Sequence, residues 1–328
     1  MRGEIFINSS KKIPVYVLSG FLGSGKTTVL LNMLEHCKKK GLQPGIILNE
    51  IGQTNVEGHL FENQKVFELL DGCICCTIQE DLKETMNELI TEMEHSPLDV
   101  LFIEGTGVAN PMEIQEVLLS HPYTDQFDLM SIITVLDASN YLEYQSIFSS
   151  STEVRNLIHE QMICGSLLVL NKTDLVPLNQ LESIKQKITK KSKQEKTIME
   201  SVYGKIDAEL LFEKRIHSVT IGKSPLDVEH HHHHHHSTLQ ALKLEDCPVV
   251  RKKEFGKWLK HLPANVLRGK GFVEIESSHQ LYSFQYASRK VAFTPVPAAL
   301  NRKPVIILIG LGLDTEQIND HWKQLVKQ

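Results

Sequence analysis

The glycine-rich segment at residues 20–27, GFLGSGKT, constrains this chain more than any other feature of its sequence. It fits the pattern G-x-x-x-x-G-K-[ST], with Gly20, Gly25, Lys26 and Thr27 at the fixed positions. The flanking residues read as a buried strand before the segment and a helix after it. A strand, a glycine loop and a helix place successive backbone N–H groups around a phosphate at the helix N-terminus. The segment therefore predicts a nucleotide-phosphate site, in which Lys26 reaches the β- and γ-phosphates and Thr27 ligates Mg²⁺.

A second motif, Asn171-Lys172-Thr173-Asp174, follows another predicted buried strand at residues 166–170. The carboxylate of Asp174 can accept two hydrogen bonds from N–H donors on the edge of guanine, whereas adenine has no donor at the equivalent ring nitrogen. Together with the phosphate loop, this motif predicts that the nucleotide is GTP. A small-molecule kinase that uses ATP is the alternative for this domain.

A third strand end, at residues 100–107 with the sequence VLFIEGTG, supplies an acid and two glycines. Glu104 can hold Mg²⁺ through water, and Gly107 can place a backbone N–H group on the γ-phosphate. Lys26 and Glu104 are therefore the predicted catalytic residues. The sequence identifies no side chain as the general base.

Three of the six cysteines are crowded into residues 71–77, DGCICCT. In a plain strand Cys73 and Cys75 would share a face and Cys76 would point away, so a turn at the strand end is needed to bring the sulfurs together. The next residues match a capping box, which puts the thiols beside a helix N-terminus, where thiolates are favoured. Three soft ligands with an open fourth position suit Zn²⁺ held for transfer, and Cu⁺ or Co²⁺ are alternatives by ligand type.

The composition excludes several classes of protein. The formal net charge of −5 leaves no excess of basic residues for binding nucleic acid. No apolar run approaches the length of about 18 residues that a membrane-spanning helix needs, and the N-terminus does not read as a signal peptide. The cysteines are not spaced like a disulfide framework, which favours the reducing cytoplasm. We therefore expect a cytoplasmic protein with no nucleic-acid or membrane partner.

Strands and helices alternate as far as residue 222, and the predicted strands carry uninterrupted apolar runs. Such runs fit strands that are covered on both faces, so we expect an α/β doubly wound P-loop domain at residues 1–222. The predicted strands are residues 13–19, 45–49, 66–70, 100–104, 131–137, 166–170 and 216–221.

Residues 223–247 read as a His-rich linker, and residues 248–328 as a smaller α+β domain with a helix at 254–262 and another at 315–327. Neutral imidazoles in a flexible linker offer many interchangeable metal ligands without fixing a geometry. We therefore expect the tract to collect metal rather than to form the transfer site. Its members are His230, His231, His232, His233, His234, His235 and His236.

The motifs GFLGSGKTT, NEIG, GCICC, IEGTG and NKTD, in this order and followed by LRGKGFVEIE, resemble the CobW-type branch of the G3E P-loop GTPases, a family of metallochaperones. The resemblance covers essentially the whole chain. It implies slow GTP hydrolysis coupled to the delivery of Zn²⁺ or Co²⁺ to a client metalloprotein. By position it implies nucleotide and Mg²⁺ contacts from Gly23, Ser24, Gly25, Lys26, Thr27, Thr28, Gly107, Asn171, Lys172 and Asp174, and metal ligands at Cys73, Cys75 and Cys76.

The chain departs from the family at the N-E motif. Family members often carry acids at the two outer positions, where Leu48 and Gln53 stand here, so accessory carboxylate metal sites are not expected, although Glu50 remains. Two functions stay open at this point: a GTP-driven metal insertase with a protein client, and a GTP-gated metal buffer or sensor without a dedicated client. Formation of a homodimer is also left open.

Overall fold

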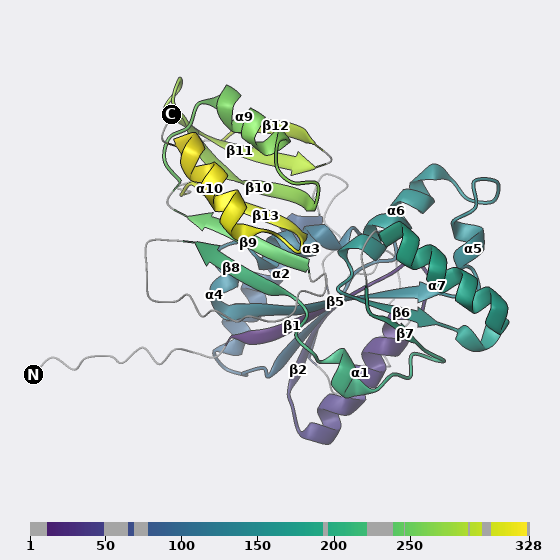
Figure 1. The fold of residues 1–328 in the computed structure, drawn as a ribbon. Coiled ribbons are helices and arrows are strands. Elements are labelled where there is room, and N and C mark those ends of the chain that lie inside the picture. The colour runs from purple at the N-terminus through teal and green to yellow at the C-terminus, as the bar shows by residue number, and fades with distance from the viewer. Residues whose placement is uncertain are drawn as a thin grey trace, which may run out of the picture. The chain divides into compact units, whose positions relative to one another are not determined.

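The computed structural model describes residues 12–48, 65–68, 78–192, 196–221, 239–245, 247–287, 289–296 and 303–326. The chain divides into two compact units, Met1–Arg215 and Ile216–Gln328. Each unit is built on a sheet of its own (Figure 1). The phosphate loop and the N-K-x-D motif both belong to the first unit.

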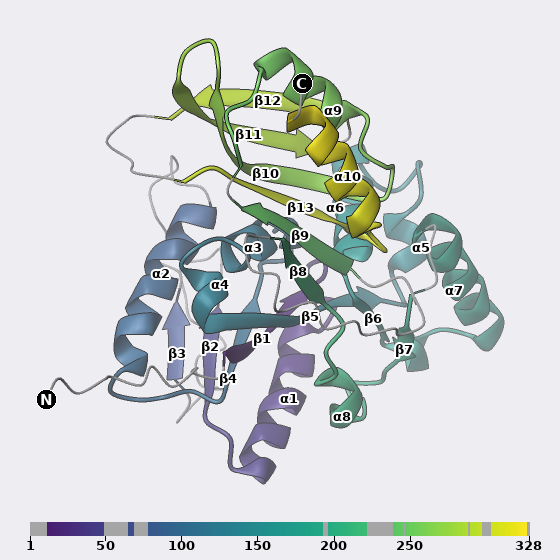
Figure 2. The ribbon, with the colours of Figure 1, turned by 60° about the vertical axis from the view of Figure 1, so that its left-hand side comes forward.

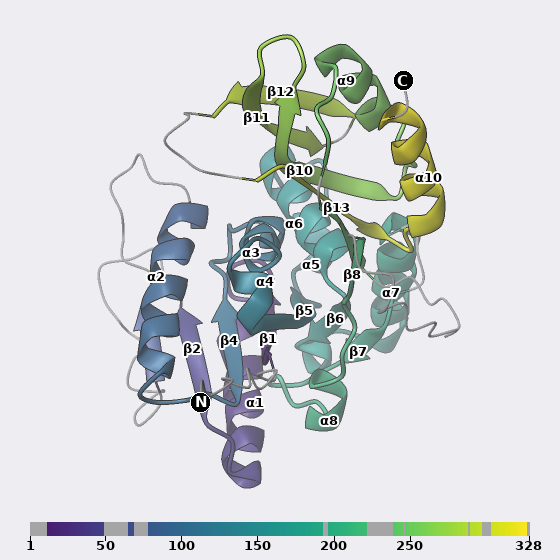
Figure 3. The same cartoon turned by 90° about the vertical axis from the view of Figure 1, so that its left-hand side faces the viewer.

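The sheet of the first unit has seven parallel strands in the order β3-β2-β4-β1-β5-β6-β7, most of which can be followed side by side in Figure 3. From β1 the chain passes to β2 and β3 on one side, returns to β4 next to β1, and then continues through β5, β6 and β7 on the other side. The order thus reverses beside β1, and ligands bind at the carboxyl ends of the strands at such a point. The strands are β1 (Ile13–Ser19), β2 (Pro44–Leu48), β3 (Lys65–Glu68), β4 (Val100–Glu104), β5 (Phe127–Asp137), β6 (Leu167–Asn171) and β7 (Ile198–Glu200).

Helices connect these strands and cover the sheet. They are α1 (Lys26–Lys40), α2 (Ile78–Met93), α3 (Pro111–Leu118), α4 (Tyr123–Gln126), α5 (Tyr141–Tyr144), α6 (Thr152–Cys164), α7 (Leu178–Ser192) and α8 (Ala208–Leu211).

Strand β6 shows why its sequence is apolar throughout. Leu167 and Val169 belong to a core that includes residues of α1 and α8, whereas Leu168 and Leu170 belong to a core with α6 and α7. Side chains alternate between the two faces of a strand, so a strand covered on both faces must be apolar at every position. The predicted doubly wound α/β fold is confirmed.

The second unit has a six-stranded sheet in the order β12-β11-β10-β13-β9-β8. Figure 2 shows α9 and α10 together beside this sheet. The elements are β8 (His217–Ile221), β9 (Leu239–Glu245), α9 (Lys252–Lys260), β10 (Val266–Ile275), β11 (Gln280–Ala287), β12 (Lys290–Pro295), β13 (Val305–Leu311) and α10 (Thr315–Val326).

Aromatic side chains hold the two helices of the second unit to its sheet. The rings of Phe255 and Trp258 on α9 stack with their centroids 5.7 Å apart, and Trp258 meets Trp322 of α10 at 5.2 Å. Phe255 also contacts Phe284 of β11 edge-on at 5.0 Å. Offset and edge-on ring pairs of this kind stabilise the fold beyond the gain from burying the rings. The helix predicted at residues 254–262 thus forms as α9 and turns Phe255 and Trp258 into the core, and the predicted α+β class is confirmed.

The strand predicted at residues 216–221 forms, as β8, but its assignment to the sheet of the nucleotide domain is wrong. It pairs in parallel with β9 in the second sheet. The edge position beside β6 belongs instead to β7, which has only three residues and is not fully buried. A strand this short has no buried run for sequence patterning to detect.

The segment predicted as a linker, residues 223–247, contains β9. This strand pairs with β13 along its whole length, and Leu242 and Leu244 enter the core of the second unit. Its alternating sequence, LQALKLE, is a half-buried strand pattern that the neighbouring histidines obscured. The histidine tract itself lies outside the described residues.

Lys196 completes the C-terminal end of α6, whose last turn has no basic residue. Its Nζ atom donates to the backbone oxygens of Met162 at 2.9 Å and Gly165 at 2.7 Å, and also to that of Ile163. Burial lowers the pKa of Lys196 to about 8, so the ammonium is still charged at neutral pH and has three N–H donors. The lysine thus supplies hydrogen bonds and a positive charge where the end of a helix needs both.

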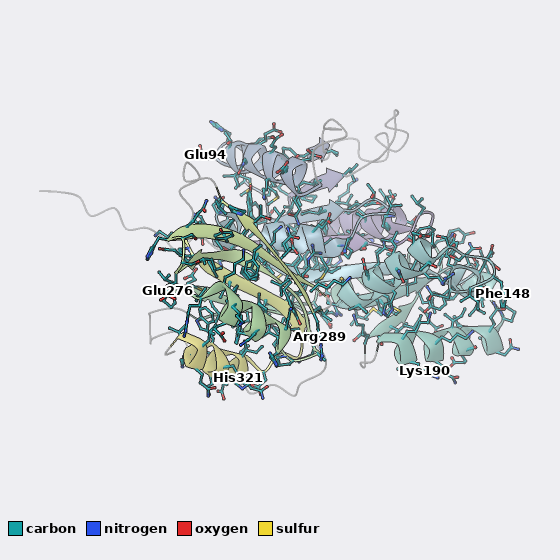
Figure 4. The ribbon with its side chains drawn as sticks, turned by 90° about the horizontal axis from the view of Figure 1, so that it is seen from above. Glu94, Phe148, Lys190, Glu276, Arg289 and His321 are labelled. Carbon is teal, nitrogen blue, oxygen red and sulfur yellow. The ribbon has the colours of Figure 1, made fainter. Side chains whose placement is uncertain are left out.

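Replacing Lys196 by Met should lower the free energy of unfolding of the first unit by about 2–3 kcal/mol, because buried carbonyl oxygens lose a charged donor while the alkyl chain is kept. Urea denaturation of the metal-free and nucleotide-free protein measures this loss. Lys190→Met is the matched control, since Lys190 lies exposed on α7 (Figure 4) and should cost less than about 0.5 kcal/mol. Equal losses in the two variants would contradict the role given to Lys196.

Candidate functional site

The phosphate loop runs from the end of β1 into α1 and depends on its glycines. Gly23 and Gly25 have left-handed φ angles of 71° and 101°. A Cβ atom at Gly25 would lie 2.3 Å from Nδ2 of Asn171, so both the backbone angle and the available space require glycine there. Gly25 is also the N-cap of α1, which has no side-chain cap and no acidic residue in its first turn. The positive end of this helix is therefore suited to a phosphate.

Lys26 and Thr27 occupy the first turn of α1. Lys26 is buried, and Oγ1 of Thr27 donates a hydrogen bond of 2.9 Å to Oε1 of Glu104, at the end of β4. Strand β1, which leads into the phosphate loop and α1, is the neighbour of β4, with Leu18 of β1 opposite Glu104. The fold thus joins two residues that the sequence predicted separately as magnesium ligands. A hydroxyl and a carboxylate are hard oxygen donors, and this donor set suits Mg²⁺.

The turn after β4 packs directly on the phosphate loop. A Cβ atom at Gly107 would lie 2.5 Å from Cγ of Leu22 and 2.6 Å from its backbone nitrogen. From α6, Nε2 of the fully buried Gln161 donates to the oxygens of Gly107 at 3.1 Å and Ala109 at 3.2 Å. Gln161 therefore fixes the turn beside the loop. Sequence analysis missed this residue, because a polar residue within a helix gives no signal of a distant backbone partner.

Two residues of the N-K-x-D motif hold two successive carbonyl groups of the phosphate loop. Nδ2 of Asn171 donates to the oxygen of Ser24 at 3.0 Å, and Nζ of Lys172 donates to the oxygen of Gly23 at 2.7 Å. Oδ1 of Asn171 also accepts a hydrogen bond from the backbone of Gly204 at 3.0 Å. Asn171 therefore joins the phosphate loop to the turn that follows β7.

The remaining predicted nucleotide residues lie at the same edge of the sheet. Asp174 is exposed in the short 3-10 helix Thr173–Leu175, directly after β6, where its carboxylate is accessible. Thr28 is half-buried in the first turn of α1. The phosphate loop follows β1, Glu104 is the last residue of β4, and Asp174 follows β6. All three therefore lie at the shared carboxyl edge of the parallel strands.

Asp137, at the end of β5, is a site residue that sequence analysis did not identify. Its Oδ2 atom accepts hydrogen bonds from Nζ of Lys172 at 2.7 Å and from Nδ2 of Asn140 at 3.0 Å. Its Oδ1 atom accepts from the backbone of Ser139 at 2.9 Å and from its hydroxyl at 2.6 Å. Burial raises the pKa of Asp137, but the hydrogen bonds from Lys172, Ser139 and Asn140 outweigh it and hold the pKa below its usual value. The carboxylate is therefore charged at neutral pH.

The turn after β7 is a second missed element. Gly204 has a left-handed φ of 65°, and a Cβ atom there would lie 3.0 Å from the backbone nitrogen of Val29. Nδ2 of Asn32, on α1, donates to the oxygens of Gly204 at 2.8 Å and Tyr203 at 3.4 Å. This turn is thus held from two sides, by Asn32 and by Asn171.

The predicted metal ligands Cys73, Cys75 and Cys76 lie outside the described residues, as do Glu50, Gln53 and His230–His236. The described part begins again with α2 at Ile78, two residues after Cys76, and Nε2 of Gln79 donates to Oε2 of Glu116 on α3 at 2.7 Å. Within the described residues there is no group of three or more histidine, cysteine or acidic side chains that could hold a metal ion.

Family comparison agrees with this arrangement over most of the chain. Residues 14–200 match the CobW/HypB/UreG nucleotide-binding domain, and residues 240–326 match the C-terminal domain of the cobalamin synthesis protein CobW. The chain belongs to the CobW/HypB/UreG family. The resemblance stated from its sequence motifs is therefore confirmed.

The chain is similar to two curated members of this family. It is 30% identical over 223 residues to the zinc chaperone CobW of Sinorhizobium, covering 61% of this chain and 62% of that protein. It is 32% identical over 214 residues to the zinc-regulated GTPase metalloprotein activator 1 of Dictyostelium discoideum, covering 55% of this chain and 44% of that protein. The matched region thus spans less than two thirds of each of these relatives.

A solved structure supports the fold. The zinc-bound triple mutant of the YjiA GTPase aligns with a TM-score of 0.50 at 21% identity, over 96% of this chain and 99% of the other. Among the residues that our structure describes, no helix combines the length and the apolarity needed to cross a membrane.

Replacing Gly25 by Ala should weaken nucleotide binding by at least about 100-fold. The added methyl group would meet Asn171 and would force φ out of the left-handed region, which together would distort the phosphate loop. Equilibrium titration with a fluorescent guanine nucleotide measures the affinity.

Gly41→Ala is the matched control, because Gly41 is the left-handed C-cap at the other end of the same helix and has open space around it. It should reduce stability by about 1 kcal/mol and leave nucleotide affinity within about twofold. Binding by Gly25→Ala within twofold of the wild type would show that the loop tolerates a side chain there, contrary to its geometry.

Proposed function

We propose that this chain is a GTP-hydrolysing metallochaperone that binds Zn²⁺ through Cys73, Cys75 and Cys76 and delivers it to a client metalloprotein. The observation that carries the proposal is the connection between the phosphate loop and the N-K-x-D motif through Asn171 and Lys172. This connection supports a site in which the phosphate loop binds the phosphates and Asp174 selects guanine. The match to the CobW/HypB/UreG family, which includes relatives named as zinc chaperones, supports the metal cargo.

Guanine selection is assigned to Asp174. Its exposed carboxylate follows the buried Asn171 and the left-handed Lys172, which has a φ of 61°. The side chains of Asn171 and Lys172 contact the phosphate loop, so contacts elsewhere in the protein hold the backbone that presents the carboxylate. A carboxylate accepts hydrogen bonds and does not donate them, which favours the N–H groups of guanine over the ring nitrogen of adenine.

Phosphate chemistry is assigned to the first turn of α1 and the end of β4. Lys26 supplies a fixed positive charge for the β- and γ-phosphates, and the helix N-terminus supplies backbone N–H donors. Thr27 and Glu104 would hold Mg²⁺, which neutralises charge on the phosphates when bound. The turn at Gly107, fixed by Gln161, is positioned to respond to the γ-phosphate.

The cargo is Zn²⁺, with Co²⁺ as the alternative by ligand type. A set of three thiolates with an open fourth position can pass its metal to a client, whereas a closed set of four ligands would retain it. The histidine tract would raise the local metal concentration by tethering weaker ligands to the same chain. The thiol-based chemistry fits a reducing cytoplasm, which we propose as the location of this protein. A homodimer is compatible with this function.

The proposal predicts opposite effects for changes at the two groups of metal ligands. Replacing Cys73, Cys75 and Cys76 by Ser should remove the tightest zinc site, while deleting His230–His236 should lower zinc stoichiometry and leave that site intact. Both variants should keep the unstimulated GTPase turnover. Anaerobic zinc titration against a chromophoric chelator measures the affinity of the tightest site and the zinc stoichiometry. Phosphate release measures the GTPase turnover.

Cys37→Ser is the control for thiol loss. Cys37 is buried in α1, and burial raises the pKa of its thiol to about 11, so it is not a thiolate at neutral pH and should not contribute to zinc binding. If the histidine deletion removes the tightest site, the tract is itself a primary ligand source. A client that accelerates GTP turnover would support delivery, and zinc release without any client dependence would favour the buffer or sensor function instead.

A further inference from the structure

The structure contains a chain of charged contacts that runs from β5 through the N-K-x-D motif to the phosphate loop. Nζ of Lys172 lies 2.7 Å from Oδ2 of Asp137 and 2.7 Å from the oxygen of Gly23. The side chain of Asp137 is 3% exposed and that of Lys172 is 33% exposed. We propose that Asp137 is a positioning residue for nucleotide binding, which holds Lys172 against the phosphate loop.

The first step is that Asp137 is itself fixed before it meets Lys172. Its Oδ1 atom accepts from the backbone and the hydroxyl of Ser139, and its Oδ2 atom accepts from Asn140. The backbone of Ala138 donates to the oxygen of Asn171 at 2.9 Å, which joins the end of β5 to the end of β6. The carboxylate therefore has little freedom to follow Lys172, and Lys172 must adjust to it.

The second step is that Lys172 needs a fixed partner. Its φ of 61° is left-handed, a conformation that side-chain-bearing residues seldom adopt and that costs about 1 kcal/mol or more. Contacts on both sides of the ammonium group stabilise this conformation. One partner is a carbonyl oxygen and the other a buried carboxylate. Both hydrogen bonds have a charged donor, but only the one to Asp137 joins opposite charges, and the low exposure of its side chain keeps water from screening that attraction. Asp137 is thus the stronger of the two anchors.

The third step concerns the phosphate loop itself. The peptide group between Gly23 and Ser24 accepts from Lys172 at its oxygen and donates from its nitrogen to the oxygen of Phe21 at 3.2 Å. The next carbonyl, that of Ser24, accepts from Asn171. In a trans peptide the N–H group points away from the C=O group, so a carbonyl held toward Asn171 turns the N–H group of Gly25 the other way. Asn171 and Lys172 therefore orient two successive peptide groups of the phosphate loop. Asp137 fixes one of these two residues, Lys172.

The role of Asp137 rests on one part of the proposed function, which is that the phosphate loop binds a nucleotide. Asp137→Asn replaces an acceptor by an amide that can present a donor to the ammonium of Lys172. The variant should bind GTP about tenfold more weakly, and bound nucleotide should dissociate faster by a similar factor. In a background of Lys172→Met the same change should have an effect below about twofold, because the partner it acts through is gone.

Asp128→Asn is the matched control, since Asp128 lies at the opposite end of the same strand and forms an ion pair with Lys214. It should leave GTP affinity within about twofold. Affinities and dissociation rates are measured with a fluorescent nucleotide well below the melting temperature of every variant. If Asp137→Asn does not fold, Asp137→Ser, which leaves room for water, carries the same prediction.

An unchanged affinity in the Asp137 variant, or losses at Asp137 and Lys172 that simply add, would overturn the inference and leave Asp137 with a role in the turn alone. The proposed function has a separate test in the same experiment. If the wild-type protein binds ATP as tightly as GTP, the guanine assignment fails. The double-mutant cycle for Asp137 and Lys172 can still be measured with either nucleotide.

Discussion

The contact between Asn171 and the phosphate loop is the interaction on which the rest of the site depends. The Nδ2 atom of Asn171 donates a hydrogen bond to the oxygen of Ser24 and occupies the space where a side chain at Gly25 would lie. The loop after β1, the motif after β6 and the turn after β7 all meet at this amide. Because Asn171 is almost fully buried, the cost of leaving its amide without partners keeps these segments together.

The residues of the N-K-x-D motif have different roles. Asn171 and Lys172 use their side chains on the protein itself, which leaves Asp174 exposed at the end of the turn. A site built in this way separates positioning from recognition. Asn171 is buried and Lys172 has a left-handed backbone, and both fix the position of the chain. Asp174, the residue assigned to recognise guanine, stays accessible to solvent and ligand.

Most of the fold and much of the nucleotide site could be predicted from sequence, because both depend on local patterns. The glycine loop, its flanking strand and helix, and Glu104 at the end of a strand are each visible within a few residues. Asp137, Gln161 and Gly204 were not identified, since their partners are distant in the chain and only the sheet order brings them together. β8 was assigned to the wrong sheet for the same reason: an apolar run shows that a strand is buried but not which strand it pairs with.

The first unit also offers a route between the nucleotide site and α2, which follows the proposed metal ligands in the chain. The turn at Glu104 and Gly107 leads into α3, where Glu116 holds Gln79 in the first turn of α2, three residues after Cys76. The most direct test of the account is the zinc affinity of the cysteine triplet with a non-hydrolysable GTP analogue and with GDP, measured by competition with a chelator. We predict affinities that differ by about 5–150-fold, with an equal factor in nucleotide affinity when zinc is bound. Identical zinc affinities in the two nucleotide states would contradict a GTP-driven zinc carrier.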